Sequence, residues 1–374
     1  MKKVIIFHIS EFGGHSKAAQ NIKEALHAKD TEISALNING LKYFYPYWEK
    51  VVDFVYTSVV KHSPSLWGKI YDRKYVIKNL SPLRKLVNRL TFTKLARLIR
   101  EFNPSCFVAT QAFPCGVVAD FKKRFQLKTP LIAVVTDYYP HRFWIHSCVD
   151  KYVVACPEAK DILLREGIEK EKVKIAGIPI SIKFLASYPK EEVSQQLGFI
   201  PHLPSVMLMG GGLGIGPIKR IAEALDAINA NFQIIVICGR NKRLYNWFTR
   251  NGRRFQKPVF CFSYIDFVHK IMDFSDIIIT KGGGITISEA LAKGLAIIIT
   301  NPIPGQEERN VRYLSKRGVI VQADEAEKTQ DAVRELFMNK KRMYFLKEGA
   351  KEISFIDSSV RIVDLIFEEL FVAE

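Results

Sequence analysis

The stretch that decides the fold of this chain is residues 280–300, TKGGGITISEALAKGLAIIIT, which continues as NPIPGQE over residues 301–307. The apolar run just before it, residues 277–279, has the composition of a buried parallel strand. Residues 282–284 form a glycine turn, and residues 285–293 have the composition of a helix that ends at Gly294. This order of strand, turn and helix predicts one unit of an α/β domain.

The glycine turn at the start of this helix is suited to an anion. Unpaired backbone N–H groups and the helix dipole both favour negative charge there, so a diphosphate is held without a lysine. Glu289, one turn into the helix, is placed to accept hydrogen bonds from a ribose diol, and Pro302 and Pro304 stiffen a loop that presents Gln306 and Glu307 to sugar hydroxyls. The ordered set predicts a nucleotide-sugar site, although the glycine turn alone fits an ordinary strand-to-helix connection equally well.

Length and composition bound the other possibilities. The 374 residues suffice for two α/β domains. No apolar run approaches the roughly 20 residues needed to cross a bilayer, and residues 1–7, MKKVIIF, lead into a strand rather than a signal peptide, so we expect a cytoplasmic protein. The six cysteines have no metal-ligand spacing, which predicts small core residues in a reducing compartment and no zinc site.

The formal charge of +17 is concentrated in one segment. Residues 61–100 hold eleven Lys or Arg and one acid, Asp72, interleaved with aromatic and aliphatic residues at helical spacing. This pattern suits a surface that lies on anionic lipid, where each cation is worth ~1 kcal/mol. A solvated basic helix pair is the second interpretation. Nucleic acid ranks third, because no nucleic-acid-binding motif accompanies the charge.

A second candidate site begins near the N-terminus. Residues 3–9, KVIIFHI, have a buried-strand pattern, and residues 10–20, SEFGGHSKAAQ, turn into a helix that runs to about Lys29. Gly13 and Gly14 allow close backbone approach of a substrate. His15 then lies at the positive end of the helix, where a neutral imidazole is a sensible general base for an acceptor hydroxyl. The plainer interpretation is a helix-capping histidine.

A further N-terminal motif is VVTDYYPHRFWIH, residues 134–146. Asp137 lies at the carboxyl end of a strand, where open α/β sheets bind ligands, so it is a candidate either to orient His15 or to bind the acceptor. The alternative is that Asp137 only caps the next turn and that Trp144 and His146 are packing residues. Residues 110–114, TQAFP, also end a strand and are candidates for lining the acceptor site.

Residues 181–203 lack regular periodicity and predict an interdomain linker. The second domain starts with the strand at residues 206–209, and the glycine loop GGGLGIG, residues 210–216, opens its first helix as another phosphate cradle. No Lys-Ser or Lys-Thr follows, so this is not a Walker loop. CGRN at residues 238–241 stands where a nicotinamide-binding domain needs an acid, which argues against a dehydrogenase.

These motifs resemble the lipid glycosyltransferases that include processive diacylglycerol glucosyltransferases and monogalactosyldiacylglycerol synthases, and more distantly the lipid-linked muropeptide N-acetylglucosaminyltransferase. The resemblance extends from His8 to about Gly318. It implies two Rossmann-like α/β domains facing a cleft, the GT-B glycosyltransferase fold. We expect an acceptor- and membrane-binding domain at residues 1–185, a UDP-sugar domain at 200–345, and C-terminal helices at 346–374 that cross back to the first domain.

The resemblance also implies a reaction, a single inverting displacement of UDP by a diacylglycerol or glycolipid hydroxyl at the inner membrane face. His15 and Asp137 are the implied catalytic residues. The implied UDP-sugar contacts are Gly14, Gly211, Gly212, Ile265, Gly283, Gly284, Thr286, Glu289, Gln306 and Glu307. No metal or other cofactor is expected, because helix ends supply the positive field.

The chain departs from the family pattern at two places. Two glycines precede His15, where relatives often have three glycines or Gly-x-Gly. Glu11 stands near the position at which some members have an aspartate, and the role of Glu11 is left open. Gly282 replaces a common proline, which should loosen the loop but keep its N–H donors.

Three other functions are compatible with parts of the sequence. They are a transferase acting on another lipid-linked acceptor of the peptidoglycan-precursor type, a UDP-sugar epimerase of the same build, and a non-catalytic UDP-sugar sensor at the membrane. An epimerase has no need of the basic segment, and a sensor has no need of both His15 and Glu289. The choice between glucose and galactose, and the number of sugars added, are not legible in the sequence.

Overall fold

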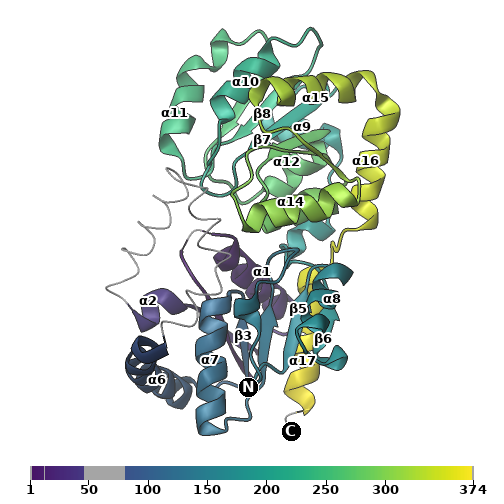
Figure 1. Ribbon diagram of the computed structural model, residues 1–374. Helices are drawn as coiled ribbons and strands as arrows, with labels where there is room; N and C mark the ends of the chain where they lie inside the picture. The colour runs from purple at the N-terminus through teal and green to yellow at the C-terminus, as the bar shows by residue number, and fades with distance from the viewer. Residues whose placement is uncertain (1, 12, 46–80, 373–374) are drawn as a thin grey trace. The chain divides into compact units, whose positions relative to one another are not determined.

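The computed structural model describes residues 2–11, 13–45 and 81–372, which form two compact α/β units (Figure 1). The first unit comprises Met1–Ile182, Pro304–Gln306 and Asp357–Glu374, and the second comprises Lys183–Ile303 and Glu307–Ile356. Each is built on a six-stranded sheet in which the paired strands are parallel. The predicted fold class, two Rossmann-like domains, is confirmed.

The sheet of the first unit has the order β2-β1-β3-β4-β5-β6. Its strands are β1 (Lys3–His8), β2 (Ser34–Asn39), β3 (Cys106–Ala109), β4 (Leu131–Val134), β5 (Lys151–Val154) and β6 (Val173–Ile175). The helices between them are α1 (Gly14–Lys29), α2 (Gly40–Phe44), α6 (Ser81–Phe102), α7 (Ala112–Phe125) and α8 (Pro157–Arg165). The central strands are buried almost throughout, as expected for a parallel sheet covered on both faces.

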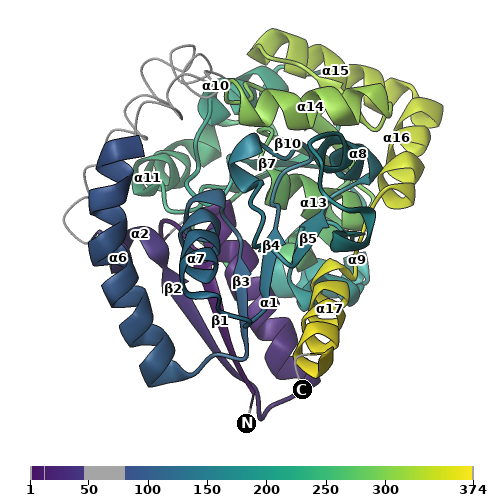
Figure 2. The same cartoon turned by 60° about the horizontal axis from the view of Figure 1, so that its bottom comes forward.

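The last helix, α17 (Ser358–Val372), belongs to the first unit although it ends the chain. It lies beside α1 (Figure 2). Its buried residues Ile362, Val363 and Ile366 share one core cluster with Ile22 and Leu26 of α1. The hydroxyl of Ser358 also accepts a hydrogen bond from the Ile180 amide at 3.1 Å. The helix that follows the second unit in sequence therefore completes the core of the first.

The sheet of the second unit has the order β12-β11-β10-β7-β8-β9. Its strands are β7 (Ser205–Met209), β8 (Gln233–Ile237), β9 (Val259–Phe262), β10 (Ile277–Thr280), β11 (Ala296–Ile299) and β12 (Ile320–Gln322). The helices are α9 (Lys190–Leu197), α10 (Ile218–Asp226), α11 (Lys242–Asn251), α12 (Val268–Phe274), α13 (Gly284–Ala292), α14 (Gln306–Lys316), α15 (Ala326–Met338) and α16 (Lys340–Glu352).

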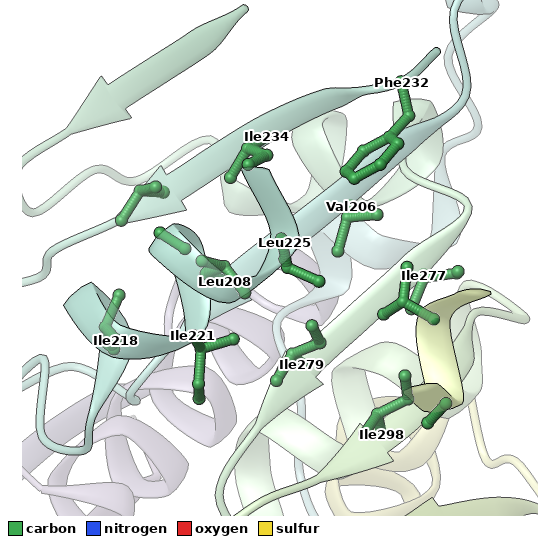
Figure 3. Packing of buried hydrophobic residues seen from close by; sticks show 14 of the residues in the cluster. Val206, Leu208, Ile218, Ile221, Leu225, Phe232, Ile234, Ile277, Ile279 and Ile298 are labelled. Carbon is green, nitrogen blue, oxygen red and sulfur yellow. The ribbon is translucent and has the colours of Figure 1, made fainter. Parts of the chain in front are cut away.

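The core on one face of this second sheet consists of branched aliphatic side chains. Figure 3 shows Ile221 and Leu225 of α10 packed against Val206 of β7, Ile234 of β8 and Ile277 of β10. All five are at most 2% exposed, which accounts for the continuous apolar runs in these strands. This packing sets the positions of the strand ends that carry the glycine loops.

The structure corrects the expectation of an irregular linker at residues 181–203. Residues 190–197 form α9, which packs against α12. Only Val193 and Ser194 of this helix are buried, so its sequence shows a single buried apolar position over two turns. That is too few to produce a visible helical periodicity.

The predicted membrane segment is described only in part. Residues 61–80 lie outside the described residues, and the chain from residue 81 forms α6. Here Lys94 donates to the carbonyl oxygens of Tyr43 and Phe44, at 3.3 and 3.0 Å, and Arg97 pairs with Glu101 at 2.7 Å. Lys94 therefore holds the end of α2. In the described parts of the chain, no helix combines the length and apolar character needed to span a bilayer.

We expect that replacing Ile366 by Ala will destabilise the first unit by about 2–5 kcal/mol, because it deletes a fully buried side chain between α17 and α1. The free energy of unfolding from chemical denaturation measures the loss. Glu368→Ala, at an exposed position of the same helix, is the matched control and should change stability by less than about 0.5 kcal/mol. Equal effects of the two substitutions would show that α17 contributes no core packing.

Candidate functional site

Three neighbouring strands of the first unit bring polar residues to one edge of the sheet. His15 is the second residue of α1, shortly after β1 ends. Thr110 directly follows β3, and Thr136 lies two residues after β4. Because β1, β3 and β4 are adjacent and parallel, their carboxyl ends lie together. This edge is where open α/β sheets bind their ligands.

The hydrogen bonds of His15 determine which ring nitrogen carries the proton. Nδ1 lies 2.9 Å from the carbonyl oxygen of Thr110 and 2.9 Å from the hydroxyl oxygen of Thr136. A carbonyl oxygen only accepts, so Nδ1 is the donor and the neutral ring has its lone pair on Nε2. Within the described residues Nε2 makes no hydrogen bond to the protein. The imidazole is therefore oriented to take a proton at Nε2.

Burial keeps this imidazole neutral. Desolvation lowers the pKa of His15 to about 4, against the opposing effect of the hydrogen bond to the Thr110 carbonyl, and the nearby His8 lowers it further. His8 also has a lowered pKa, chiefly through burial. Neutral histidine is the form that can act as a base at physiological pH.

The other predicted residues of the first unit have varied surroundings. Asp137 is buried, 7% exposed, and follows Thr136, but the ring bonds of His15 go to Thr110 and Thr136. Gly14 is the exposed first residue of α1, and Glu11 pairs with Lys42 at 2.6 Å on the surface. His146 donates from Nε2 to the Phe143 carbonyl at 3.0 Å, and Trp144 is buried. The direct catalytic role of Asp137 stays a prediction.

In the second unit, the glycine loop after β7 is held by the loop after β8. The amide of Arg240 donates to the carbonyl of Gly212 at 3.0 Å, and the Asn241 side-chain amide donates to the carbonyl of Gly214 at 3.0 Å. Gly214 has φ +60°, and a Cβ there would lie 2.0 Å from the Cys238 carbonyl oxygen. No larger residue fits at this position. The CGRN sequence thus supports the glycine loop that contains Gly211 and Gly212.

The second glycine turn, after β10, is held by a charged pair. Lys281 forms an ion pair with Glu307, whose other carboxylate oxygen accepts from the Ile303 amide at 2.9 Å. A Cβ on Gly282 would lie 2.7 Å from Cβ of Glu307, so the two segments are in contact. Glu307 thus connects Lys281, at the start of the glycine turn, to the loop that contains Ile303. Its predicted contact with sugar hydroxyls stays a prediction.

The remaining predicted donor contacts surround these loops. Gly283 precedes α13 and Gly284 begins it, while Thr286 and Glu289 are buried within this helix, 8% and 3% exposed. Gln306 is the first residue of α14, and Ile265 is partly buried between β9 and α12. These positions distribute the predicted contacts over the carboxyl ends of β7, β9, β10 and β11.

Sequence reasoning missed three contributors. Thr136 was not singled out, although its place before Asp137 at a strand end was a usable signal. The pairing of Lys281 with Glu307 had no signal, because the two residues are distant in sequence. Thr280 is 1% exposed, its hydroxyl has no hydrogen-bond partner among the described residues, and it lines a cavity with Gly210, Gly216 and Thr300. In the same described residues no cluster of His, Cys, Asp and Glu could hold a metal ion.

Two family models match the chain in succession. The monogalactosyldiacylglycerol (MGDG) synthase model matches residues 15–180, and the glycosyltransferase family 28 C-terminal domain model matches residues 205–362. A processive diacylglycerol β-glucosyltransferase of Bacillus pumilus is 26% identical over 372 residues, covering 98% of this chain and 95% of that protein. The enzyme of the same name from Staphylococcus epidermidis is 28% identical over 351 residues, covering 91% and 86%.

Solved structures share the two-domain architecture. MurG of Acinetobacter baumannii has a TM-score of 0.63 at 14% identity, covering 98% of this chain and all of that one. HepE of Anabaena, in complex with UDP-glucose, has a TM-score of 0.59 at 13% identity, with 98% and 100% coverage. A UDP-GlcNAc 2-epimerase of Neisseria meningitidis, bound to UDP-GlcNAc, has a TM-score of 0.62 at 14% identity, with the same coverage of both chains. At these identities the likeness shows the fold alone.

We expect Gly214→Ala to destabilise the second unit by more than about 2 kcal/mol, because its Cβ would overlap the Cys238 carbonyl and its φ is positive. Gly212→Ala is the matched control, since a Cβ there meets no atom within 4 Å. Thermal unfolding of the two variants measures the difference. Similar melting temperatures would contradict the described loop geometry.

The lowered histidine pKa values predict acid sensitivity. Burial, and to a smaller extent Lys183, Lys293 and Lys270, lower the pKa of His269 to about 4, from 6.5. Between these values the unfolded chain binds more protons, so stability falls as the pH drops from 6.5 towards 4. His269→Gln should flatten this dependence by up to about 1.4 kcal/mol per pH unit. Unfolding measured at several pH values tests this, with the exposed His202→Gln as control; identical slopes would refute it.

Proposed function

We propose that the chain is an inverting hexosyltransferase of the lipid glycosyltransferase family, because an MGDG synthase model and a family 28 C-terminal domain model match it in succession. It moves glucose or galactose from a UDP-sugar to diacylglycerol or to its glycolipid. The observation that carries the proposal is the orientation of His15, with Nδ1 bound to the Thr110 carbonyl and Nε2 available as a base.

In the proposed reaction, Nε2 of His15 removes the proton from the acceptor hydroxyl. The hydroxyl oxygen forms a bond to the anomeric carbon while the bond from that carbon to the UDP oxygen breaks, which inverts the anomeric configuration. The electron pair of the broken bond stays with UDP, and the proton stays on His15 until it passes to water. Thr110 and Thr136 hold the ring throughout, and a well-placed base of this kind contributes about 10²–10⁴ in rate.

The second unit supplies the proposed donor site. The proposed diphosphate ligands are backbone N–H groups of the loop at residues 210–216 and of the turn before α13. Of the two carboxylates that the sequence places near this turn, Glu307 is paired with Lys281 and Glu289 is buried. These donors and the α13 dipole stabilise the negative charge that develops on departing UDP. The unpartnered hydroxyl of Thr280 adds a further polar group beside the same loops. UDP-glucose bound to HepE and the names of the relatives support this donor class.

The acceptor is assigned from the relatives named processive diacylglycerol β-glucosyltransferases, which this chain matches over nearly its full length. The proposal includes a peripheral position on the inner membrane face. The basic segment at residues 61–100 supports it, since a bilayer-embedded acceptor must be met at the lipid surface. Repeated transfer onto the glycolipid product is compatible with the same site.

The direct test is UDP release from UDP-glucose or UDP-galactose, each with and without diacylglycerol in anionic vesicles, with lipid products resolved by mass. We expect lipid-dependent release and a hexosyl-diacylglycerol product from one donor. Release that appears only with an undecaprenyl-linked acceptor would replace diacylglycerol as the substrate. Binding of UDP-sugar without turnover on any lipid would identify a sensor.

We expect His15→Ala to reduce kcat by about 10²–10⁴ while leaving the affinity for UDP nearly unchanged, because the residue acts on the acceptor proton. Single-turnover kinetics and calorimetric UDP titration separate the two effects. His27→Ala provides the matched control, as His27 is an exposed histidine on the same helix. Rapid turnover by the His15 variant would exclude this residue as the base.

A further inference from the structure

A strongly basic surface of the second unit is not used by the proposed reaction. Residues 238–258 contain seven Lys or Arg and no Asp or Glu. They run from the end of β8 through α11 and the 3-10 turn η4 (Gly252–Arg254) to the start of β9. Lys257 is buried and donates to two backbone carbonyls, and Arg240 lies over the Tyr264 ring, 4.9 Å from its centre. The other five are exposed, and we call them the basic face of α11: Lys242, Arg243, Arg250, Arg253 and Arg254.

The helical period places these cations away from the core. Leu244 and Phe248, one turn apart, are 5% and 1% exposed and pack into the core of the second unit. At 3.6 residues per turn, Lys242, Arg243 and Arg250 then project from the opposite side of α11. The two arginines of η4 directly follow α11 and are also exposed, so all five cations lie within residues 242–254.

The charge of this face is not neutralised inside the unit. On α15 three exposed ion pairs involve residues of this helix: Lys328 with Glu325 at 2.9 Å, Arg334 with Asp331 at 2.9 Å, and Glu335 with Arg342 of α16. Among the described residues no ion pair joins any member of the basic face of α11. The nearby Asp226 is occupied by the backbone amides of Gln256 and Lys257, at 3.1 and 3.0 Å. Five uncompensated charges within residues 242–254 create a positive field that favours an extended anionic partner.

We propose that the basic face of α11 docks the second unit on the anionic surface of a lipid bilayer. Phosphate groups of the lipids are the recognised chemistry, and each cation near such a surface strengthens binding by about fivefold. The choice of a bilayer over a nucleic acid rests on the proposed function, because a diacylglycerol acceptor lies in a membrane. The face itself agrees with this choice. No exposed large aromatic ring lies within residues 242–254 of the described chain, so base stacking has no platform there.

The test is sedimentation of the full chain with phosphatidylcholine vesicles that contain or lack phosphatidylglycerol. The variant replaces the five residues of the basic face by Gln. At low salt we expect the partition of this variant onto the anionic vesicles to be about tenfold or more below that of the unchanged protein. At high salt the difference between the two proteins should shrink, because screening also weakens the binding of the unchanged protein. Partition onto pure phosphatidylcholine should not change.

A matched variant removes the same net charge from another surface of the same unit. It replaces Lys328, Arg334, Lys340, Lys341 and Arg342 by Gln, which are exposed residues of α15 and α16. We expect a change of less than about twofold, because Lys328, Arg334 and Arg342 are paired with acids and, in the described part of the chain, only Lys340 and Lys341 add unpaired charge. Equal losses in the two variants, or no loss in either, would overturn the proposal. Melting temperatures of both variants verify that each is folded.

Two further measurements separate the remaining possibilities. Loss of binding to duplex RNA by the first variant, with vesicle partition intact, would overturn the proposal in favour of a nucleic-acid surface. UDP release by the unchanged protein is measured separately with diacylglycerol in detergent micelles, where no bilayer is present. Failure of that assay would reject the proposed function, whereas the vesicle comparison would still decide the docking surface.

Discussion

Parallel pairing of the strands is the constraint on which the rest of this molecule depends. A parallel sheet brings the carboxyl ends of all its strands to one edge, so loops that are distant in sequence become neighbours. In the first unit the order β1-β3-β4 brings together His15, Thr110 and Thr136. In the second, the order β10-β7-β8 brings the two glycine loops beside the CGRN turn. Each site is therefore assembled by backbone hydrogen bonds within a sheet.

The two candidate sites require different charge states: one needs a neutral base and the other must stabilise a negative leaving group. A base must be neutral before it reacts, and burial of the His15 imidazole provides that state by lowering its pKa. A departing diphosphate is stabilised by positive potential. Backbone N–H groups at a helix start supply that potential even where no lysine or arginine contacts the phosphates. Lys281, the cation nearest the second glycine turn in sequence, is committed to Glu307. A charge pair thus keeps this glycine turn in place, and the proposed contacts to the diphosphate are left to main-chain groups.

Much of the positive charge lies outside these sites. The segment at residues 61–100 holds eleven of the 55 Lys and Arg residues, and the basic face of α11 holds five that are exposed. Exposed charges add little to folding stability but act over a Debye length on a charged surface. A chain that must meet its acceptor at a bilayer has a use for such charges, whereas an enzyme with two soluble substrates does not.

The sequence by itself determined the fold class, the two glycine loops, the helix after Gly283 and the place of His15 at a helix start, because these features depend on local composition and on a short hydrophobic period. It did not reveal α9, whose two turns bury one apolar side chain. Only the tertiary structure decided which groups orient His15, that the carboxylate of Glu307 is paired with Lys281, and that α17 completes the first core. Those contacts join residues tens to hundreds of positions apart, and their partners are selected by sheet order and packing rather than by any local pattern.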